Sequence, residues 1–544
     1  MKKVTTPTIE EFRKYVQDYR SVPVSRTILS DSRTPIEVLR SLKAVSRHCF
    51  ILESLEDSVR WGRYTFLGYD PSLEFTCRDG VVTIRSAATM RFHDTDPAQY
   101  IRQIIAEHKA PRIPGLPPFT GGLMGYFAYD FIKYSEPSLN PDSGSCGSGE
   151  SKNAAENIEN KENIENKEDI EKKENKVRKE NKGNKENEEK EENREQNEEQ
   201  FNDVDLMLFE KIIAFDNLRQ TITMIVNVRT DAPEENYRSA CLELDIMEEI
   251  VRHGTPAVNP PLKLKSDFRP MFSREQFCAM VERGKHYIFE GDIFQVVLSN
   301  RLMAEMEGSL LDTYRLLRTR NPSPYMFYIS SDSLELAGSS PETLVKLQDG
   351  ILHTFPLAGT RPRGRTHEED LALEKSLLSD PKELSEHNML VDLGRNDLGR
   401  LSIFGTVKVE KYMGIERYSH VMHIGSTVRG EIRGDKDALD AISSVLPAGT
   451  LSGAPKIRAC EIIHELERGR RGIYGGAIGY IDFTGNMDTC ISIRLAFKKN
   501  GRVYVRSGAG IVADSVPENE YTECINKAAA VINAVRESEG GIDR

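Results

Sequence analysis

The chain has 544 residues, a length that predicts more than one domain and about three at most. Its formal net charge of −12 argues against a protein that lives on nucleic acid, whose contact surface would be basic. An anionic substrate stays possible, because a local site can be positive in an acidic protein. The start, MKKVTTPTIEEFRKY, has no apolar run, and no stretch approaches about 18 consecutive apolar residues, so we expect neither a secretory signal nor a membrane span. The eight cysteines form no C-x-x-C pair and indicate buried thiols in a cytoplasmic protein.

Residues 1–260 predict an N-terminal domain that a polar insertion interrupts. Helices are expected at 9–19 and 35–46, and GGLMGYFAYDFIKY is typical of a strand with a tight turn. Residues 143–200 are almost all Asn, Glu and Lys, and because such a segment buries little apolar area we expect it to be disordered. After it, DVDLMLFEKIIAFDNLRQTITMIVNV predicts two strands joined at residues 216–217.

The proline-containing segment 256–269 predicts a linker to a second domain at 270–540. This domain opens with a helix expected at 273–290, where Ser273 and Gln276 form a capping-box pattern. Strands are expected in IFQVVLSNRL, PYMFYISS, ELAGSS, GIYGGAIGYIDF, MDTCISIRLAFKK and RVYVRSGAGIVA. Further helices are expected at 312–320, 370–378, 381–397, 435–444, 455–467 and 517–537. Hairpin-linked strands between helices predict an α/β protein of the α+β type, with largely antiparallel sheets flanked by helices.

Two of these expected helices carry an acidic residue that is suited to hold a cation. Glu386 borders the apolar face of the helix at 381–397, and Glu523 precedes Lys527 by four residues on the helix at 517–537. Two carboxylates from separate helices suit Mg²⁺, which takes one or two protein oxygens and completes its shell with substrate and water. The sequence alone does not pair the two residues, and a solvated helix surface is the alternative for each.

Three further segments have a possible role in binding. RSGAGIVADS brings two glycines to the start of the second acidic helix, where backbone amides can approach a carboxylate. FPLAGTRPRGR ends an expected strand with three arginines, and HVMHIGSTVRG contains His423. The structural alternatives are a tight turn, a solvated basic loop and a core histidine.

The order and spacing of many short blocks resemble those of one enzyme family. The blocks are QVVLS, SSPE, PLAGTRPRGR, ELSEHNMLVDLGRNDLGR, VMHIGSTVRG, LPAGTLSGAPKIRA, YGGAIGY, SIR and SGAGIVADSVPENEYTECINKA. Over about residues 270–535 the chain resembles the chorismate-utilising enzymes, most closely the anthranilate synthase large subunits, and FILESLEDSVRWGRYTFLG extends the similarity into the first domain. The resemblance implies a two-domain chorismate-binding fold with packed antiparallel sheets. It also implies conversion of chorismate and ammonia to anthranilate and pyruvate, the first committed step of tryptophan biosynthesis.

The same resemblance assigns site residues motif by motif. It implies that Glu386 and Glu523 bind Mg²⁺. The implied chorismate contacts are Gly359, Thr360, Tyr474, Arg494, Gly508, Ala509 and Gly510. Glu342 and His423 match residues of proton transfer, without a decision as to which is the acid, and Lys456 is expected near the site.

Two positions distinguish among the relatives. The water-adding relatives carry a lysine base before the VVL run, where this chain has Gln295, so addition of water is disfavoured. Aminodeoxychorismate synthases usually carry a lysine in P-I-K-G-T, where this chain has Ala358 in PLAGT. Both positions favour an anthranilate synthase, and the large subunit of an aminodeoxychorismate synthase stays the alternative.

The resemblance also implies regulation and a partner. The residues that match the family's tryptophan pocket are Glu53, Ser54, Pro324, Tyr325 and Met326, which implies feedback inhibition by tryptophan. A non-catalytic tryptophan-binding protein is an alternative of another class, and the intact set of acidic, arginine and histidine residues argues against it. No cysteine lies in the glycine-rich strand–turn–helix that glutamine hydrolysis needs, so we expect a separate glutamine amidotransferase subunit to supply ammonia.

Overall fold

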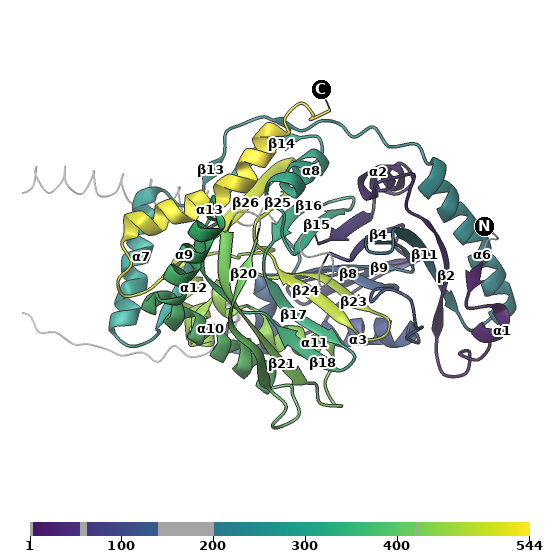
Figure 1. The fold of residues 1–544 in the computed structure, drawn as a ribbon, viewed down its shortest axis with the longest axis horizontal. Helices are drawn as coiled ribbons and strands as arrows, with labels where there is room; N and C mark the ends of the chain where they lie inside the picture. The colour runs from purple at the N-terminus through teal and green to yellow at the C-terminus, as the bar shows by residue number, and fades with distance from the viewer. Residues whose placement is uncertain (1–3, 55–61, 140–200, 419–420, 544) are drawn as a thin grey trace, which may run out of the picture. The chain divides into compact units, whose positions relative to one another are not determined.

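Two large β-sheets organise the residues that the computed structural model describes, 4–54, 62–139, 201–418 and 421–543 (Figure 1). Both sheets belong to the unit formed by Met1–Ser135 and Asn202–Arg544. Every pairing between their named strands is antiparallel, as predicted. The predicted insertion at 143–200 lies outside the described residues.

The first sheet contains strands from both ends of the sequence. In spatial order they are β1 (Thr5–Thr6), β2 (Ser21–Leu29), β11 (Thr221–Arg229), β10 (Lys211–Asp216), β4 (Tyr64–Tyr69), β3 (Cys49–Glu53), β15 (Tyr325–Ser330), β16 (Glu335–Ser340), β25 (Leu495–Lys499), β26 (Arg502–Ile511), β14 (Gln295–Glu307) and β12 (Lys263–Leu264). Two short strands, β13 (Arg269–Pro270) and β22 (Gly453–Ala454), also pair with β14. The pairing of β3 with β15 therefore joins the N-terminal and C-terminal parts of the chain.

The second sheet is built in the same mixed way. In spatial order its strands are β19 (Leu357–Pro362), β21 (Val421–Glu431), β18 (Ile351–Thr354), β17 (Thr343–Gln348), β24 (Met487–Ile491), β23 (Ala477–Asp482), β8 (Gly122–Phe127), β9 (Val204–Phe209), β5 (Leu73–Arg78), β6 (Val81–Arg85) and β7 (Thr89–His93). β20 (Lys408–Arg417) pairs with β21. Here β8 and β23 join the two parts of the chain. The division into domains at 260–270 stays a prediction.

Helices flank these sheets. They are α1 (Ile9–Phe12), α2 (Pro35–Val45), α3 (Ala98–Glu107), α4 (Ile132–Ser135), α6 (Pro233–His253), α7 (Arg274–Phe289), α8 (Leu311–Arg320), α9 (His367–Leu378), α10 (Pro381–Gly399), α11 (Ala438–Val445), α12 (Lys456–Glu467) and α13 (Pro517–Glu537). Figure 1 shows α7, α9, α10, α12 and α13 gathered at one end of the sheets, and α1 and α6 at the other. None of the helices in the described ranges has the length and apolar character needed to cross a membrane.

Helices and strands are held together by buried apolar side chains. One cluster joins Leu244 of α6 with strand residues such as Val24 of the first sheet. Another joins Ile101 of α3 to the second sheet, and a third packs Phe277 of α7 with Ile463 of α12 and its neighbours. Each fully buried side chain of this size contributes roughly 1.5–3 kcal/mol. The clusters therefore give the elements near the cavity a fixed framework.

Helices at the C-terminal end agree closely with the prediction. α7 begins after Ser273, and the expected capping box is present: Ser273 N–H donates to Gln276 Oε1 at 2.8 Å, and Gln276 N–H donates to Ser273 Oγ at 3.3 Å. The predicted helix at 9–19 is wrong in length, because regular helix ends at Phe12 and turns follow. Helices α3 and α6 were missed, although the buried residues of α6 recur at helical spacing.

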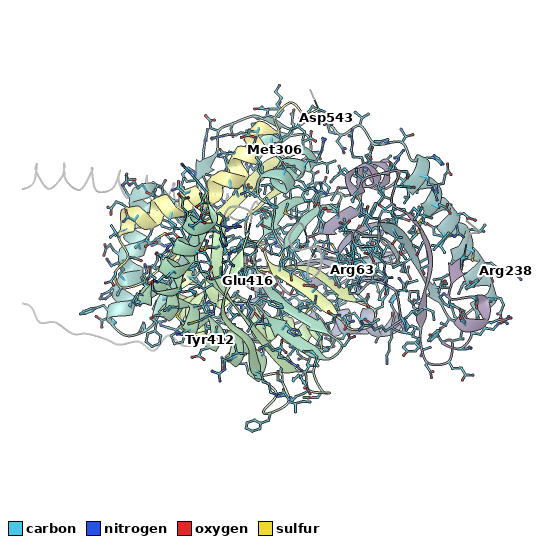
Figure 2. All side chains as sticks on the ribbon, in the orientation of Figure 1. Arg63, Arg238, Met306, Tyr412, Glu416 and Asp543 are labelled. Carbon is cyan, nitrogen blue, oxygen red and sulfur yellow. The ribbon has the colours of Figure 1, made fainter. Side chains whose placement is uncertain are left out.

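The predicted hairpin at 216–217 is confirmed, with Asp216 closing its turn. The Asp216 carboxylate accepts hydrogen bonds from Leu218 N–H at 3.1 Å and Arg219 N–H at 3.0 Å. Arg63, labelled in Figure 2, forms an ion pair with it at 2.8 Å. The turn is therefore held by a side chain that the loop sequence itself supplies.

Two predicted strands are in fact two strands each, because the chain passes from one sheet to the other. Residues 204–216 divide at Glu210 into β9 of the second sheet and β10 of the first. Residues 487–499 divide into β24 of the second sheet and β25 of the first, and Arg494 stands in the gap with a φ of 51°. The chain also changes sheet between β16 and β17, where Glu342 lies.

Candidate functional site

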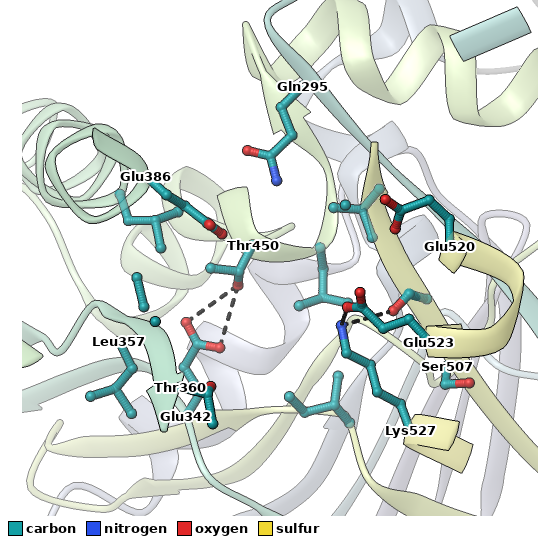
Figure 3. Close-up of a pocket in the computed structure, with 18 of the residues that line it drawn as sticks. Gln295, Glu342, Leu357, Thr360, Glu386, Thr450, Ser507, Glu520, Glu523 and Lys527 are labelled. Atoms are coloured by element: carbon teal, nitrogen blue, oxygen red, sulfur yellow. Dashed lines mark hydrogen bonds and ion pairs between the residues drawn. The ribbon is translucent and has the colours of Figure 1, made fainter. Parts of the chain in front are cut away.

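A cavity of about 690 Å³ lies where these sheet-to-sheet crossings meet α10 and α13 (Figure 3). The predicted site residues that line it are Glu342, Gly359, Thr360, Glu386, His423, Tyr474, Arg494, Gly508, Gly510 and Glu523. Four cationic side chains, Lys382, Arg494, Arg506 and Lys527, line the same cavity. A pocket of this size with cations on its wall suits a small anionic ligand.

Glu342 and Arg494 are brought together by the two crossings. Ile491 N–H donates to Glu342 O at 2.9 Å, and Ser340 Oγ donates to Ile491 O at 2.6 Å, so the crossings run side by side. Thr450 Oγ1 donates to both carboxylate oxygens of Glu342, at 3.3 and 3.4 Å. Burial raises the pKa of Glu342 to about 7, against the opposing effects of Thr450 and the charge of Arg494. The carboxyl is therefore partly protonated near neutral pH and can donate a proton.

His423 faces the same cavity from β21. Its Nδ1 lies 2.7 Å from Gly359 O and 3.1 Å from Thr360 Oγ1. Because the Gly359 carbonyl can only accept, Nδ1 carries the hydrogen and Nε2 presents a lone pair. Burial lowers the pKa of His423 below its ordinary value, so the imidazole is neutral near pH 7. The site thus contains a proton acceptor as well as a proton donor.

Position 359 requires glycine. Its φ is +65°, and a Cβ there would approach Leu377 Cδ1 to 2.8 Å and Glu383 Oε2 to 3.0 Å. This conformation lies next to a register shift between Ala358 and Arg361 in the pairing of β19 with β21. Glycine therefore allows the carbonyl to reach His423.

Glutamates from α10 and α13 face one another across the cavity, as Figure 3 shows for Glu386, Glu520 and Glu523. Burial, and then the neighbouring charges of Glu383 and Glu523, raise the pKa of Glu386. Burial and the charge of Glu523 also raise the pKa of Glu520, against a hydrogen bond from Ser515. A cation would relieve this repulsion, and a set of oxygen ligands suits a hard ion such as Mg²⁺.

The protein supplies only part of such an ion's coordination. Among the described residues, no group of three or more His, Cys, Asp or Glu side chains is arranged to hold a metal ion. Mg²⁺ characteristically accepts one or two carboxylates and fills its remaining positions with substrate oxygens and water. Glu386 and Glu523 therefore fit a magnesium ion that binds together with an anionic substrate.

The glycines of β26 form a surface that a side chain would fill. A Cβ on Gly508 would lie 2.7 Å from Leu298 O and 2.9 Å from Tyr474 Oη, and one on Gly510 would lie 2.7 Å from Gln295 Nε2. Ala509 lies between them and is fully buried in the cluster around α7 and α12. Since side chains alternate along a strand, the methyl group of Ala509 is directed away from the cavity.

The two positions that distinguish the relatives both belong to the cavity wall, one on β14 of the first sheet and one on β19 of the second. Gln295 and Ala358 both line the cavity, and Figure 3 shows the Gln295 amide directed into it. Neither side chain can take a proton from water or attack a substrate as an amine would. The lysines of the cavity come instead from α10 and α13.

The structure does not bring Lys456 into the cavity. Its ammonium group is 3.0 and 2.9 Å from the carboxylate oxygens of Asp397 and 2.9 Å from Val445 O. Lys456 is not among the residues that line the cavity. Its contacts therefore join α12 to α10 and α11 and do not reach the cavity.

The segments assigned to tryptophan binding lie side by side. Met326 pairs with Glu53 where β15 joins β3, with Pro324 and Tyr325 just before Met326 and Ser54 just after Glu53. The Glu53 carboxylate accepts hydrogen bonds from Arg318 at 2.5 and 3.0 Å and from Tyr314 Oη at 2.5 Å. Arg318 therefore already provides a positive partner for this carboxylate. Residues 55–61, which follow this segment, lie outside the described ranges.

Among the cavity residues that were not assigned from the sequence are Glu520, Lys527 and Thr450. Glu520 lies three residues before Glu523, a spacing that places both on one helix face, and this was a usable signal. Lys527 Nζ lies 2.7 Å from Glu523 Oε1 and 3.3 Å from Gly508 O. Thr450 belongs to the LPAGTLSGAPK block, but nothing in that block indicates a bond to a distant glutamate.

Comparisons with known proteins show which proteins this chain resembles. A protein from Acetivibrio thermocellus named anthranilate synthase component 1 is 42% identical over 541 residues, 98% of this chain and 99% of the relative. One of the same name from Acinetobacter calcoaceticus is 42% identical, covering 96% and 97%. The crystal structure of anthranilate synthase component I from Streptococcus pneumoniae TIGR4 has a TM-score of 0.67 at 34% identity, covering 93% of this chain and 98% of that one.

The expected fold and family are therefore confirmed. MenF, the menaquinone-specific isochorismate synthase from Escherichia coli, has a TM-score of 0.63 at 18% identity over 97% of this chain and 99% of its own, which shows a shared fold. Residues 184–533 match the family described as chorismate binding enzyme. The chain belongs to the family of chorismate binding enzymes.

Proposed function

We propose that this chain is the large subunit of an anthranilate synthase, which converts chorismate and ammonia to anthranilate, pyruvate and water. The observation that carries the proposal is its similarity, over nearly the full length, to proteins named anthranilate synthase component 1. Gln295 and Ala358 in the cavity wall support amination without a lysine base or nucleophile. An aminodeoxychorismate synthase large subunit is the second candidate, because some of these enzymes also lack the lysine.

Chorismate is a dianion, and the cavity can bind both of its carboxylates. Arg494 pairs with one carboxylate through its planar guanidinium, with Tyr474 and the amides beside Gly508 and Gly510 at the ring. Glu386 and Glu523 would hold Mg²⁺ against the other. When bound, Mg²⁺ supplies positive charge that neutralises the ring carboxylate and orients it.

In the first step, ammonia forms a bond to C2 of the ring while the C4 hydroxyl leaves. The two ring double bonds shift from C1=C2 and C5=C6 to C1=C6 and C4=C5. Hydroxide is a poor leaving group, so the protonated carboxyl of Glu342 gives its proton to this oxygen and water departs. The raised pKa of about 7 provides that proton near neutral pH. We therefore assign Glu342 as the general acid.

In the second step, the C2 hydrogen leaves as a proton and the bond from C3 to the enolpyruvyl oxygen breaks, which makes the ring aromatic. Neutral His423 accepts this proton at Nε2, because its Nδ1 is engaged by Gly359 O. The released enolpyruvate takes up a proton and becomes pyruvate. We therefore assign His423 as the general base.

The ammonia comes from a partner subunit in this proposal. The name component 1 of the relatives implies a second component. We assign it the hydrolysis of glutamine, with free ammonium as a substitute in its absence. Tryptophan inhibits by binding beside Glu53, Ser54, Pro324, Tyr325 and Met326 and favouring a state with low affinity for chorismate.

The decisive test is to incubate the purified chain with chorismate, Mg²⁺ and ammonium at mildly alkaline pH and to identify the products by fluorescence and mass. We expect anthranilate and pyruvate, abolished by EDTA and reduced by tryptophan, and inhibition relieved in Ser54→Ala. An aminated product that keeps its enolpyruvyl group would move the chain to the aminodeoxychorismate synthases. Undiminished inhibition of Ser54→Ala would remove the tryptophan assignment alone.

A further inference from the structure

One glutamate and two arginines form a buried network directly behind the cavity. The carboxylate of Glu467, at the end of α12, is fully buried. Arg471 donates to it from Nε at 3.0 Å and from Nη2 at 2.6 Å, and Arg506 Nη2 donates at 2.6 Å. The backbone N–H and hydroxyl of Ser299 donate at 2.8 and 3.0 Å. We call Glu467, Arg471 and Arg506 the buried network.

The network holds the cavity wall through backbone carbonyls. Arg471 Nη1 donates to Leu451 O and its Nη2 donates to Val297 O, both at 2.6 Å. Arg506 Nε donates to Ser299 Oγ at 2.8 Å. Val297, Leu451 and Arg506 all line the cavity. The network therefore fixes β14, β26 and the short 3₁₀ turn η4 (Gly449–Leu451) relative to one another.

The η4 turn leads from the network to the proton donor. Thr450 is the residue before Leu451, and its hydroxyl donates to both oxygens of Glu342 at 3.3 and 3.4 Å. Both distances exceed the roughly 2.5–3.0 Å that is usual for an O–H···O bond, so this contact is already long. A shift of the turn by about 1 Å would therefore remove the bond, and misplacement on this scale costs roughly 100-fold in rate.

Positioning explains the network better than stability does. A buried arginine–glutamate triad is often no more stabilising than apolar residues of the same volume, because each charge must be desolvated. Burial alone would raise the pKa of Glu467, but the charges of Arg471 and Arg506 hold it below its ordinary value, so the carboxylate stays ionised. Two arginines against one glutamate also leave one positive charge in excess behind a cavity for a dianion.

We propose that the buried network positions the proton donor: Arg471 fixes the η4 turn so that Thr450 holds the Glu342 carboxyl. The inference rests on the proposed function, because it takes Glu342 as the general acid. Arg471 and Glu467 are positioning residues, since they act on Glu342 through Thr450.

The test measures kcat/KM for chorismate against pH at constant free ammonia, in wild type, Arg471→Lys, Thr450→Val and Thr450→Ser. We call the fall of kcat/KM at high pH, which follows ionisation of Glu342, the alkaline limb. Thr450→Val removes a bond to the ionised carboxylate, so we expect the alkaline limb to move to higher pH by about one pH unit or less. Arg471→Lys keeps the charge but loses part of the carbonyl contacts, so we expect the same direction of shift and a roughly 10- to 100-fold lower rate. Thr450→Ser keeps the hydroxyl and the wild-type limb.

Arg470→Lys is the matched control, because Arg470 is the neighbouring arginine and is half-exposed, with Asp79 as its partner. We expect it to behave as wild type. A folded Arg471→Lys with the wild-type limb and rate would overturn the proposal. If Arg471→Lys does not fold, Ser299→Ala decides, since it weakens the network without deleting a charge, and an unshifted limb there counts against the network. Absence of anthranilate from the wild type would instead reject the proposed function.

Discussion

Burial acts in opposite directions on the two residues that we assign to proton transfer. It raises the pKa of Glu342 to about 7 and lowers the pKa of His423. In both cases the uncharged form is favoured, because a charge is costly in a desolvated site. A protonated acid and an unprotonated base therefore coexist over one range of pH, which the reaction requires.

These directions predict a bell-shaped profile of kcat/KM for chorismate when free ammonia is held constant. Activity falls as pH rises through about 7, because Glu342 loses the proton that it must donate. Activity also falls at acidic pH, below the ordinary range of histidine, because His423 becomes charged. Glu342→Gln is expected to lower kcat by roughly 10²–10⁴-fold and to abolish the alkaline limb.

The matched control is Glu410→Gln, because Glu410 lies on β20 outside this cavity. It should keep the wild-type profile. In kcat, measured at saturating chorismate, the alkaline limb is expected at higher pH, since the dianionic substrate opposes ionisation of Glu342. An alkaline limb that persists unchanged in Glu342→Gln would assign the acid elsewhere.

At the scale of elements, local signals predicted the helices of the C-terminal part well and strand boundaries less well. The capping box at Ser273 and Gln276 is a contact within four residues, so the sequence contains all of its information. The divisions of 204–216 and 487–499 depend on which sheet each half pairs with, and the partners lie far away in sequence. Glu210 and Lys211 interrupt the first run and Arg494 the second, but polar residues also occur within continuous strands such as β14, so these residues alone do not mark a division.

The same reasoning explains what was predictable of the site. Motifs located the residues on the cavity wall because each motif is continuous in sequence. The bond from Thr450 to Glu342 joins residues 108 positions apart, so only the fold shows it. Lys456 stands in a motif beside the site, but its side chain extends to Asp397 on α10.

The pair of Lys456 and Asp397 leads to a prediction about how elements are joined. The pair is largely buried between α12 and α10, so Lys456→Met leaves Asp397 without its cation and is expected to destabilise the protein by about 3–5 kcal/mol. Urea unfolding measures this loss. The double variant Lys456→Met with Asp397→Leu should recover much of it, because neither charge is then left unpaired.

For the same variant we expect the kcat of the folded enzyme to stay within a few-fold of wild type. Lys456 does not line the cavity, and its ammonium group bonds to Asp397 of α10 and to the carbonyl of Val445 in α11. A large loss of kcat with normal stability would show that Lys456 acts in catalysis directly.

At the scale of the whole chain, the site depends on both parts of the sequence. Each sheet is continuous only through a pairing between the parts, β3 with β15 and β8 with β23. The glutamate, histidine and arginine of the cavity all come from the C-terminal part, while the strands that extend their sheets come from the N-terminal part. The two sheets therefore support the cavity jointly.

Side-chain contacts join the described residues before the insertion at 143–200 to those after it. Before it, Lys133 Nζ lies 2.8 Å from Asp203 Oδ2, and the Tyr134 hydroxyl donates to the same oxygen at 2.8 Å. Asp203, which follows it, is buried and also accepts a hydrogen bond from Asp79 N–H at 2.7 Å. A short linker can therefore replace the insertion without moving β8 or β9, and the entropic cost of closing a loop depends only weakly on its length.

We predict that replacing residues 143–200 with a short Gly-Ser linker leaves ammonia-dependent turnover at the wild-type level and changes the free energy of unfolding by about 0.5 kcal/mol or less. The control is Asp203→Ala, which removes the bonds that join the flanks and should lower stability in both the full-length and shortened chains. Turnover with ammonium and unfolding in urea measure the two effects. Loss of ammonia-dependent turnover on shortening would contradict the prediction. A loss confined to glutamine-dependent turnover with the partner subunit would assign the insertion to docking, because the chorismate cavity itself would then be intact.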